Sequence, residues 1–356
     1  MNPASVRATK RERVLRVLDE VEADATVLRS AAAVNWYLDG ARSHVSLAAD
    51  PIVRVLVDRR GDVAIVTSNE QDRLRDEELP PDVELASCDW HGSLDSVEAG
   101  LRRDRDSGRF VEESVIEARL RAERTRLLPH EADRFRALGS DVARAMTDTL
   151  TVATPDETER AVAARVTAAL TAEGVDSLVV LVGGANRGAY RHPVPTAAAL
   201  GRRAMLVVCG RRHGLIANAT RWVTFEPPTS GERAADAAIL RVESAFFTAT
   251  VDGAELRSVL AAGAQAYARH GFDPHEWRRH HQGGIAGYHG RDPRATPSTT
   301  DIVRPRQAFA WNPSGKGAKV EDTVYWDGAR MEALTQDPRW PTEIVDGRTR
   351  PAVLRR

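Results

Sequence analysis

The chain has 356 residues, of which 42% are hydrophobic, 28% charged and 5% aromatic, and its 50 Lys and Arg offset 51 Asp and Glu to give a net charge of -1. Single hydrophobic cores stop growing at about 250–300 residues, so this length predicts two domains. The apolar fraction excludes a wholly disordered chain, and the balanced charge gives no electrostatic footprint for nucleic acid or an anionic membrane.

The two cysteines, Cys88 and Cys209, are too few and too far apart for a disulfide framework or a zinc-finger spacing. The sequence also contains no run of 18 apolar residues that would span a bilayer, and it begins without an apolar signal segment. We therefore expect a cytoplasmic protein that binds neither membrane nor nucleic acid.

Short elements alternate in the first third of the chain. Residues 10–23 have helical periodicity, and short apolar runs follow at Ala25–Leu28, Val53–Val57 and Val63–Thr67. A polar, glycine-containing turn separates the last two runs, which favours a hairpin. This pattern predicts a small α/β domain over residues 1–115.

Longer helices follow. Residues 131–150 are strongly amphipathic, and a second helix is predicted from an N-cap at Thr154, with Glu157 as the capping-box acid, to a C-cap at Gly174. A third helix is predicted over 253–270.

The remaining elements of residues 116–356 are predicted strands. They are Leu178–Val182, Met205–Val208, Phe246–Val251, Ala308–Trp311 and Thr323–Trp326. Their length and order favour an α+β domain with antiparallel strands, distinct from the first domain.

Five short motifs follow one another along the chain. They are Asn35–Gly40, Arg124–Glu131, Gly183–Asn186 with Arg191–Pro193 after it, Asn218–Arg221 and Val320–Thr323. Together they resemble the creatinase/prolidase/aminopeptidase P family over nearly the whole chain. The resemblance implies an α+β fold in which an N-terminal α/β creatinase-like domain (1–115) precedes a C-terminal pita-bread catalytic domain (116–356).

The resemblance also points to a metal centre that this chain lacks in large part. Family metallopeptidases hold two divalent ions with two Asp, one His and two Glu. These positions correspond to about Val207, Asn218, a site at or beside Gly283, Asn312 and Glu321. Only Glu321 keeps a ligand, so we expect no metal cofactor and no dinuclear peptidase.

Histidines elsewhere leave a relocated metal site open as an alternative, which would make the protein a metallo-aminopeptidase or prolidase. The cluster contains His280, His281, His289 and His213. Neighbouring side chains of a strand face opposite sides, so we do not expect His280 and His281 to reach one ion.

Creatinase is a metal-free branch of the family that hydrolyses a guanidinium C–N bond with a histidine and carboxylates. His192 matches its catalytic histidine, and an imidazole can act as general base and then general acid near neutral pH. The resemblance assigns Arg291, in Tyr288–Asp292, to the substrate carboxylate, with Tyr288 and His281 as further substrate contacts. Glu321 is expected to orient His192 or a water.

Two asparagines argue against creatine as the substrate. Asn218 and Asn312 stand where creatinase has carboxylates that bind the guanidinium cation, and an amide cannot neutralise a cation. A small carboxylate-bearing molecule with a cleavable C–N or N–N bond fits better. Arg42 resembles a position that reaches the active site of a partner subunit, so the resemblance implies a homodimer with composite sites.

Two other possibilities remain open. The alternative hypothesis is an inactive pseudo-peptidase whose pocket binds a peptide, a small ligand or a partner protein, although the presence of His192, Arg291 and Glu321 together favours an enzyme. The glycine-rich turn at 313–319, which contains Lys316, could approach an anion, but it lacks the P-loop spacing and a plain β-turn is the simpler interpretation.

Overall fold

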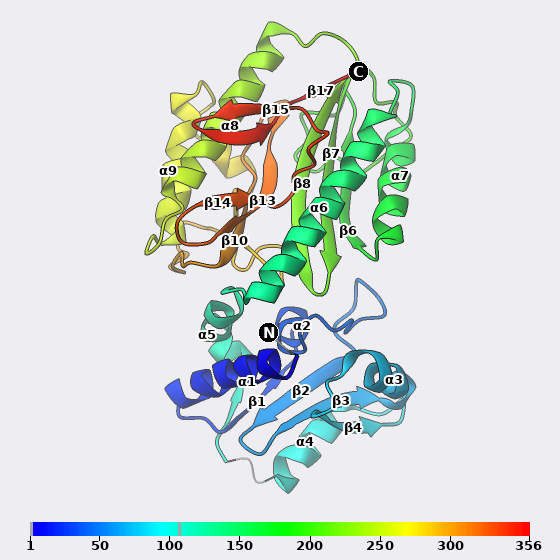
Figure 1. Ribbon diagram of the computed structural model, residues 1–356, viewed down its shortest axis with the longest axis vertical. Helices are drawn as coiled ribbons and strands as arrows, with labels where there is room; N and C mark the ends of the chain where they lie inside the picture. Colours follow the sequence, from blue (N-terminus) through cyan, green and yellow to red (C-terminus); the bar gives the residue numbers. More distant parts are fainter. Residues whose placement is uncertain (1–2, 106–107) are drawn as a thin grey trace. The chain divides into compact units, whose positions relative to one another are not determined.

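The computed structural model describes residues 3–105 and 108–356, which form two compact units (Figure 1). Unit 1 contains residues 1–128 with the short turn 213–215, and unit 2 contains 129–212 and 216–356. The boundary predicted at 115/116 falls inside helix α5 (Glu113–Arg124), which packs on α1 (Pro3–Glu20) of unit 1. The division by contacts therefore comes later in the chain.

Unit 1 is built on a five-stranded mixed sheet in the order β4-β3-β2-β1-β5. Its strands are β1 (Ala25–Leu28), β2 (Val53–Asp58), β3 (Asp62–Thr67), β4 (Glu84–Cys88) and β5 (Phe110–Glu112). Its other helices are α2 (Ala31–Tyr37), α3 (Ser68–Arg73), the π-helical turn η1 (Leu74–Glu78) and α4 (Leu94–Asp104). The predicted hairpin is confirmed: β2 and β3 pair antiparallel, and Asp58 Oδ1 accepts the turn N–H groups of Arg60 (2.8 Å) and Gly61 (3.0 Å).

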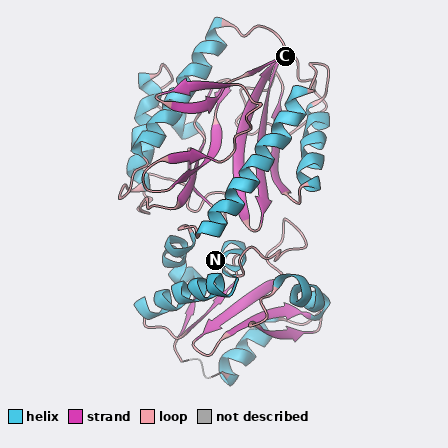
Figure 2. Cartoon of the chain, in the orientation of Figure 1, coloured by secondary structure: helices cyan, strands magenta, loops and turns pink. Residues whose placement is uncertain are grey.

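Unit 2 contains an eight-stranded sheet whose main path is β6-β7-β8-β13-β10-β9 (Figure 2). Its strands are β6 (Asp176–Gly183), β7 (Arg203–Arg212), β8 (Leu215–Thr224), β9 (Gly283–Ala286), β10 (Gln307–Trp311), β13 (Glu321–Trp326), β14 (Met331–Ala333) and β17 (Leu354–Arg355). Two small hairpins accompany it, β11 (Ser314–Gly315) with β12 (Ala318–Lys319), and β15 (Thr342–Val345) with β16 (Arg348–Pro351).

Four long helices cover this sheet. They are α6 (Pro129–Thr151), α7 (Glu159–Ala172), α8 (Ser230–Ala249) and α9 (Leu256–Arg269), with a 3-10 turn η2 (Glu276–Arg279). Helix α6 lies across β7 while α7 packs on β6, and α8 and α9 lie side by side (Figure 1). None of the helices in the described ranges is long and apolar enough to cross a membrane.

Residues 246–251 were predicted as a strand, and this was wrong because most of them belong to α8. Aromatic and β-branched residues suit both a strand and a buried helix face. The helix is defined further upstream, where Thr229 and Glu232 form a capping box, and its apolar face packs Phe246 on Trp311 with ring centroids 4.8 Å apart.

The predicted start of α7 was also wrong. The N-cap is Thr158, whose side chain accepts the N–H of Ala161 at 3.1 Å, and not Thr154. The Glu157 carboxylate does accept the Thr154 N–H at 3.2 Å, but this closes a turn ahead of the helix. The residues at 154–157 suit a closed turn as well as a helix N-terminus, so the local sequence does not distinguish the two. The contacts of Glu159 described below favour the later helix start.

Candidate functional site

The sheet register of unit 2 brings the positions identified by the resemblance to one face. Glu321 of β13 pairs with Thr220 of β8, whose hydroxyl donates to the Glu321 carboxylate at 3.2 Å. Because side chains alternate, Asn218 lies on the same face as Thr220. Trp311 pairs with Asp322, so Asn312 follows opposite Glu321.

Gly283 occupies the neighbouring strand β9 with a backbone that only glycine adopts easily. Its φ is +105°, and a Cβ added there would lie 2.0 Å from the carbonyl oxygen of Ala310. This backbone therefore has no room for a side chain at this position.

Glu321 is the centre of a buried charge cluster. Its carboxylate forms an ion pair with the guanidinium of Arg291, and the Lys319 ammonium lies 3.8 Å away. Burial by itself would raise the pKa of Glu321, but the charges of Lys319 and Arg291 outweigh that effect and hold the pKa below its usual range. The carboxylate is thus ionised and already matched by two cations.

Lys319 and Cys209 are site residues that the sequence did not reveal. Burial lowers the pKa of Lys319, an effect that the nearby Glu321 charge opposes. Burial raises the pKa of the Cys209 thiol to about 12, so it stays protonated and is a poor nucleophile. The available signal for Lys319 was its rarity, since it is one of three lysines in the chain.

Three imidazoles converge beside this cluster. The Nε2 atoms of His192 and His280 are 3.0 Å apart, and His280 Nδ1 lies 3.1 Å from Ser314 Oγ. The ring of His281 has its centroid 4.5 Å from that of His280 and 6.0 Å from that of His192. One potential ligand atom from each ring lies within 4.8 Å of the others.

The expectation that adjacent histidines face opposite sides was wrong here. His280 and His281 precede β9 and follow η2, so strand alternation does not apply to them. His289 instead bonds within its own loop, at 2.9 Å to the carbonyl of Arg291, and His213 lies in the β7–β8 turn. Neither belongs to the converging group.

All three imidazoles are held neutral at pH 7. Burial lowers the pKa of His280 to about 2 and that of His281 to about 4, and nearby cations reinforce both shifts. Burial, followed by the charge of Lys319, also lowers the pKa of His192, against a smaller opposing effect of Glu321. Neutral imidazole is the form that acts as a base or a metal ligand.

A buried carboxylate fixes the loop that carries His192. Glu159, the first residue of α7, accepts the N–H of Gly184 (2.8 Å), the N–H (2.9 Å) and hydroxyl (2.7 Å) of Thr196, and the guanidinium of Arg187. These partners lie before and after His192. Glu159 therefore restrains both ends of the loop.

The remaining predicted residues are placed as follows. Asn218 and Asn312 are buried, and the Oδ1 atom of each has no hydrogen-bond partner among the described residues. Tyr288 donates its hydroxyl to Glu131 Oε1 at 2.5 Å. Arg42 lies in unit 1, exposed and ion-paired with Glu77 and Glu78.

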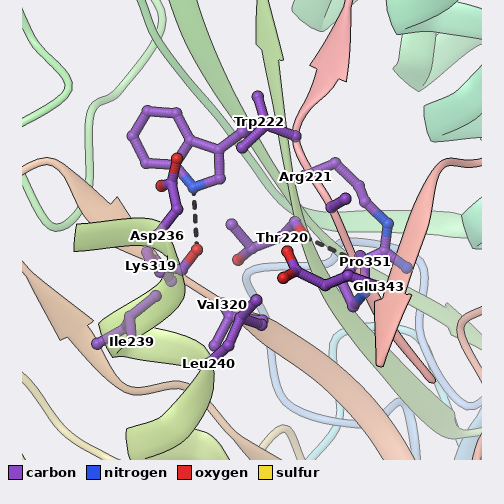
Figure 3. A pocket seen from close by; sticks show the side chains of 12 residues that line it. Thr220, Arg221, Trp222, Asp236, Ile239, Leu240, Lys319, Val320, Glu343 and Pro351 are labelled. Atoms are coloured by element: carbon purple, nitrogen blue, oxygen red, sulfur yellow. Dashed lines mark hydrogen bonds between the residues drawn. The ribbon is translucent and has the colours of Figure 1, made fainter. Parts of the chain in front are cut away.

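A small hollow lies beside β8 and α8, where the indole N–H of Trp222 donates to the Lys319 carbonyl at 2.9 Å (Figure 3). Its other lining residues include Thr220, Leu240 and Glu343. The hollow has a volume of about 30 Å³. That space suits a water and is too small for a substrate.

The fold of this chain is that of known peptidases. It is similar to the prolidase from Pyrococcus horikoshii OT3 (TM-score 0.75, 15% identity, 93% of this chain and 99% of that chain). It is likewise similar to a Xaa-Pro dipeptidase from Bacillus anthracis (0.75, 14%, 98% and 99%) and to dipeptidase PepE from Mycobacterium ulcerans (0.76, 19%, 95% and 97%). These likenesses confirm the predicted pita-bread fold.

A match at the level of the sequence identifies the family. The profile of metallopeptidase family M24 matches residues 133–333, more than half of the chain. The protein therefore belongs to the M24 family. A comparison with curated proteins found no significant match.

Proposed function

We propose that this M24 protein is a metal-independent, creatinase-like hydrolase or lyase that cleaves a C–N or N–N bond in a small carboxylate-bearing molecule. The observation that carries the proposal is the chain of contacts from Ser314 through His280 to His192, set beside an ionised Glu321. His192 is the proposed general acid and base, and His280 and Ser314 are positioning residues.

The donor set supports a reaction without the dinuclear centre of the family. Two divalent cations need several anionic oxygen ligands. At the five corresponding positions, Glu321 supplies the one carboxylate, and the buried cations Arg291 and Lys319 already neutralise it. The residues present therefore do not fit two metal ions.

The tautomers define what His192 can do. We assign the Nε2 proton of His192 to the contact with His280, and the Nδ1 proton of His280 to the Ser314 oxygen. The Nδ1 lone pair of His192 is then available to accept a proton from water. The water oxygen bonds to carbon as the C–N bond breaks, and the proton passes to the leaving nitrogen, so no oxidant is consumed.

A second candidate is favoured by one specific observation, the convergence of His192, His280 and His281. Three neutral imidazoles with an open fourth position are a common catalytic zinc site. In that case the protein would be a mononuclear metallohydrolase with its metal outside the family position. The cationic neighbours Lys319 and Arg291 oppose this candidate, because they add positive charge next to the ion.

One experiment separates the two candidates. The purified protein is dialysed against a chelator, its metal content is measured, and it is assayed with amides, N-acyl amino acids, hydrazides and Xaa-Pro dipeptides. We expect turnover that persists without metal and falls by about 10²–10⁴-fold in His192→Ala. Turnover that returns only when zinc or manganese is added would contradict the metal-independent proposal and support the second candidate.

A further inference from the structure

A second cavity in unit 2, with a volume of about 320 Å³, is separate from the histidine group. This size lies at the lower end of ligand pockets, which span about 300–1,000 Å³. The residues that line it are Ala185, Gly188, Ala189, Arg202, Arg203, Trp222, Gly231, Glu232, Ala235, Lys316 and Gly317.

Part of the cavity wall is apolar and built of small residues. Three alanines and three glycines leave the space open, and Trp222 supplies one aromatic wall. The guanidinium of Arg203 covers the Trp222 ring at 4.4 Å. Such walls suit the apolar body of a small molecule.

The charges around the cavity favour an anion. Arg202 is matched by Glu232, and Arg203 by Asp236 behind the wall (2.7 and 3.1 Å). Arg202 also has the exposed carboxylate of Glu226 at 3.6 Å. Lys316 is exposed and has no ion-pair or hydrogen-bond partner within the ranges described, so it is the cation of the cavity that is open to an anion.

Arg203 and Gly231, which both line the cavity, each carry a further N–H donor. Arg203 is 4% exposed, and its Nε atom is buried without an acceptor in the described part of the chain. Gly231 lies in the first turn of α8, where the Thr229 cap serves the Glu232 N–H and leaves the Gly231 N–H without an intrahelical acceptor. The positive end of the α8 dipole adds to the attraction for an anion.

We propose that this cavity binds a small molecule with an apolar or aromatic body and an oxyanion, carboxylate or phosphate, which lies against Lys316 and the α8 N-terminus. The glycine-rich turn noted in the sequence forms part of this cavity, because Lys316 and Gly317 at the tip of the β11–β12 hairpin line it. The proposal concerns binding alone and stands apart from the reaction assigned to His192.

The test is isothermal titration calorimetry of the full chain with three probes. Benzoate and phenyl phosphate carry the two oxyanions on the same body, and benzyl alcohol carries the body without charge. We expect saturable binding of at least one anion, tighter than benzyl alcohol, and the preferred anion identifies the source of the oxyanion. Equal binding of benzyl alcohol, or no saturable binding of either anion, overturns the proposal.

Variants localise the signal. Lys316→Ala should weaken anion binding at least tenfold, and Ala189→Trp should fill the exposed mouth and abolish binding. Arg330→Ala, an exposed arginine outside the cavity, serves as the matched control and should bind like wild type. Unchanged affinity in Lys316→Ala overturns the assignment. His192→Ala should bind normally, which separates a failure of this proposal from a failure of the proposed reaction.

Discussion

At the residue scale, the candidate site is organised around a buried carboxylate that protein cations neutralise. Glu321 is paired with Arg291 and faces Lys319, and all three side chains are at most 7% exposed. A buried charge is stable only when it is paired and hydrogen-bonded. The stability of each of these three buried charges therefore depends on the other two.

This dependence predicts a large effect of Glu321→Gln on stability. The variant leaves two cations buried without their counter-charge, and we expect a loss of about 3–5 kcal/mol in the free energy of unfolding. Chemical denaturation followed by tryptophan fluorescence measures it. Glu332→Gln is the matched control, because Glu332 forms a partly exposed pair with Arg136, and it should cost about 0–1 kcal/mol. Equal stability of the two variants would contradict the burial argument.

The histidines predict a pH dependence of stability. Their pKa values are lowered in the folded protein, to about 4 for His281 and about 2 for His280, so below pH 6.5 the unfolded chain binds more protons. Their stabilising contribution is complete above pH 6.5. It is lost as the pH falls from 6.5 to about 4 for His281, and further towards 2 for His280.

The measurement is the free energy of unfolding between pH 7 and 4 in wild type and in His281→Asn. The variant cannot titrate, and we expect its loss over this range to be smaller by on the order of 2 kcal/mol. His275→Asn, at an exposed histidine, should follow the wild-type curve. Superimposable curves for His281→Asn and wild type would show that His281 titrates normally.

At the element scale, the start of α7 decides how the His192 loop is held. The helix begins at Glu159, and that residue accepts hydrogen bonds from both ends of the loop. A start four residues earlier would place Glu159 inside the helix, away from its N-terminal turn. The cap at Thr158 is therefore part of the framework of the site.

The two threonines give a paired test of this start. Thr158→Ala removes the cap that serves the Ala161 N–H and should destabilise the protein by about 1 kcal/mol. Thr154→Ala removes no helix cap and should change stability by less than about 0.5 kcal/mol. Thermal or chemical denaturation measures both losses of stability. A larger loss in Thr154→Ala than in Thr158→Ala would support the helix start at Thr154 that the sequence predicts.

At the scale of the whole molecule, the resemblance to creatinase predicts a homodimer in which Arg42 reaches the site of the partner. The Arg42 side chain is accessible to a partner subunit, because it is 65% exposed on unit 1. Light scattering after size exclusion should give twice the chain mass of 39.0 kDa, and Arg42→Ala should lower turnover without changing that mass. A mass of 39.0 kDa at all concentrations would contradict the prediction.

Several elements were predictable because their signal is local. The strand Ala25–Leu28, the β2–β3 hairpin and α6 follow from apolar periodicity and a polar turn, and the structure confirms them. Strand β8 was missed because all ten of its residues are buried, so it lacks the alternation that marks a half-buried strand. The stretch at 246–251 was misassigned for a related reason, since its residues suit either state.

The sequence by itself determined the family, because the motifs keep their order along the chain and the M24 profile matches residues 133–333. The resemblance further predicts that Glu321 is the one ligand kept among the five metal positions of the family. Only the tertiary structure decided which charges surround Glu321. Lys319 and Arg291 meet Glu321 through strand pairing and loop packing, and His280 meets His192 from 88 residues away. Such contacts depend on distances between segments that no local pattern encodes.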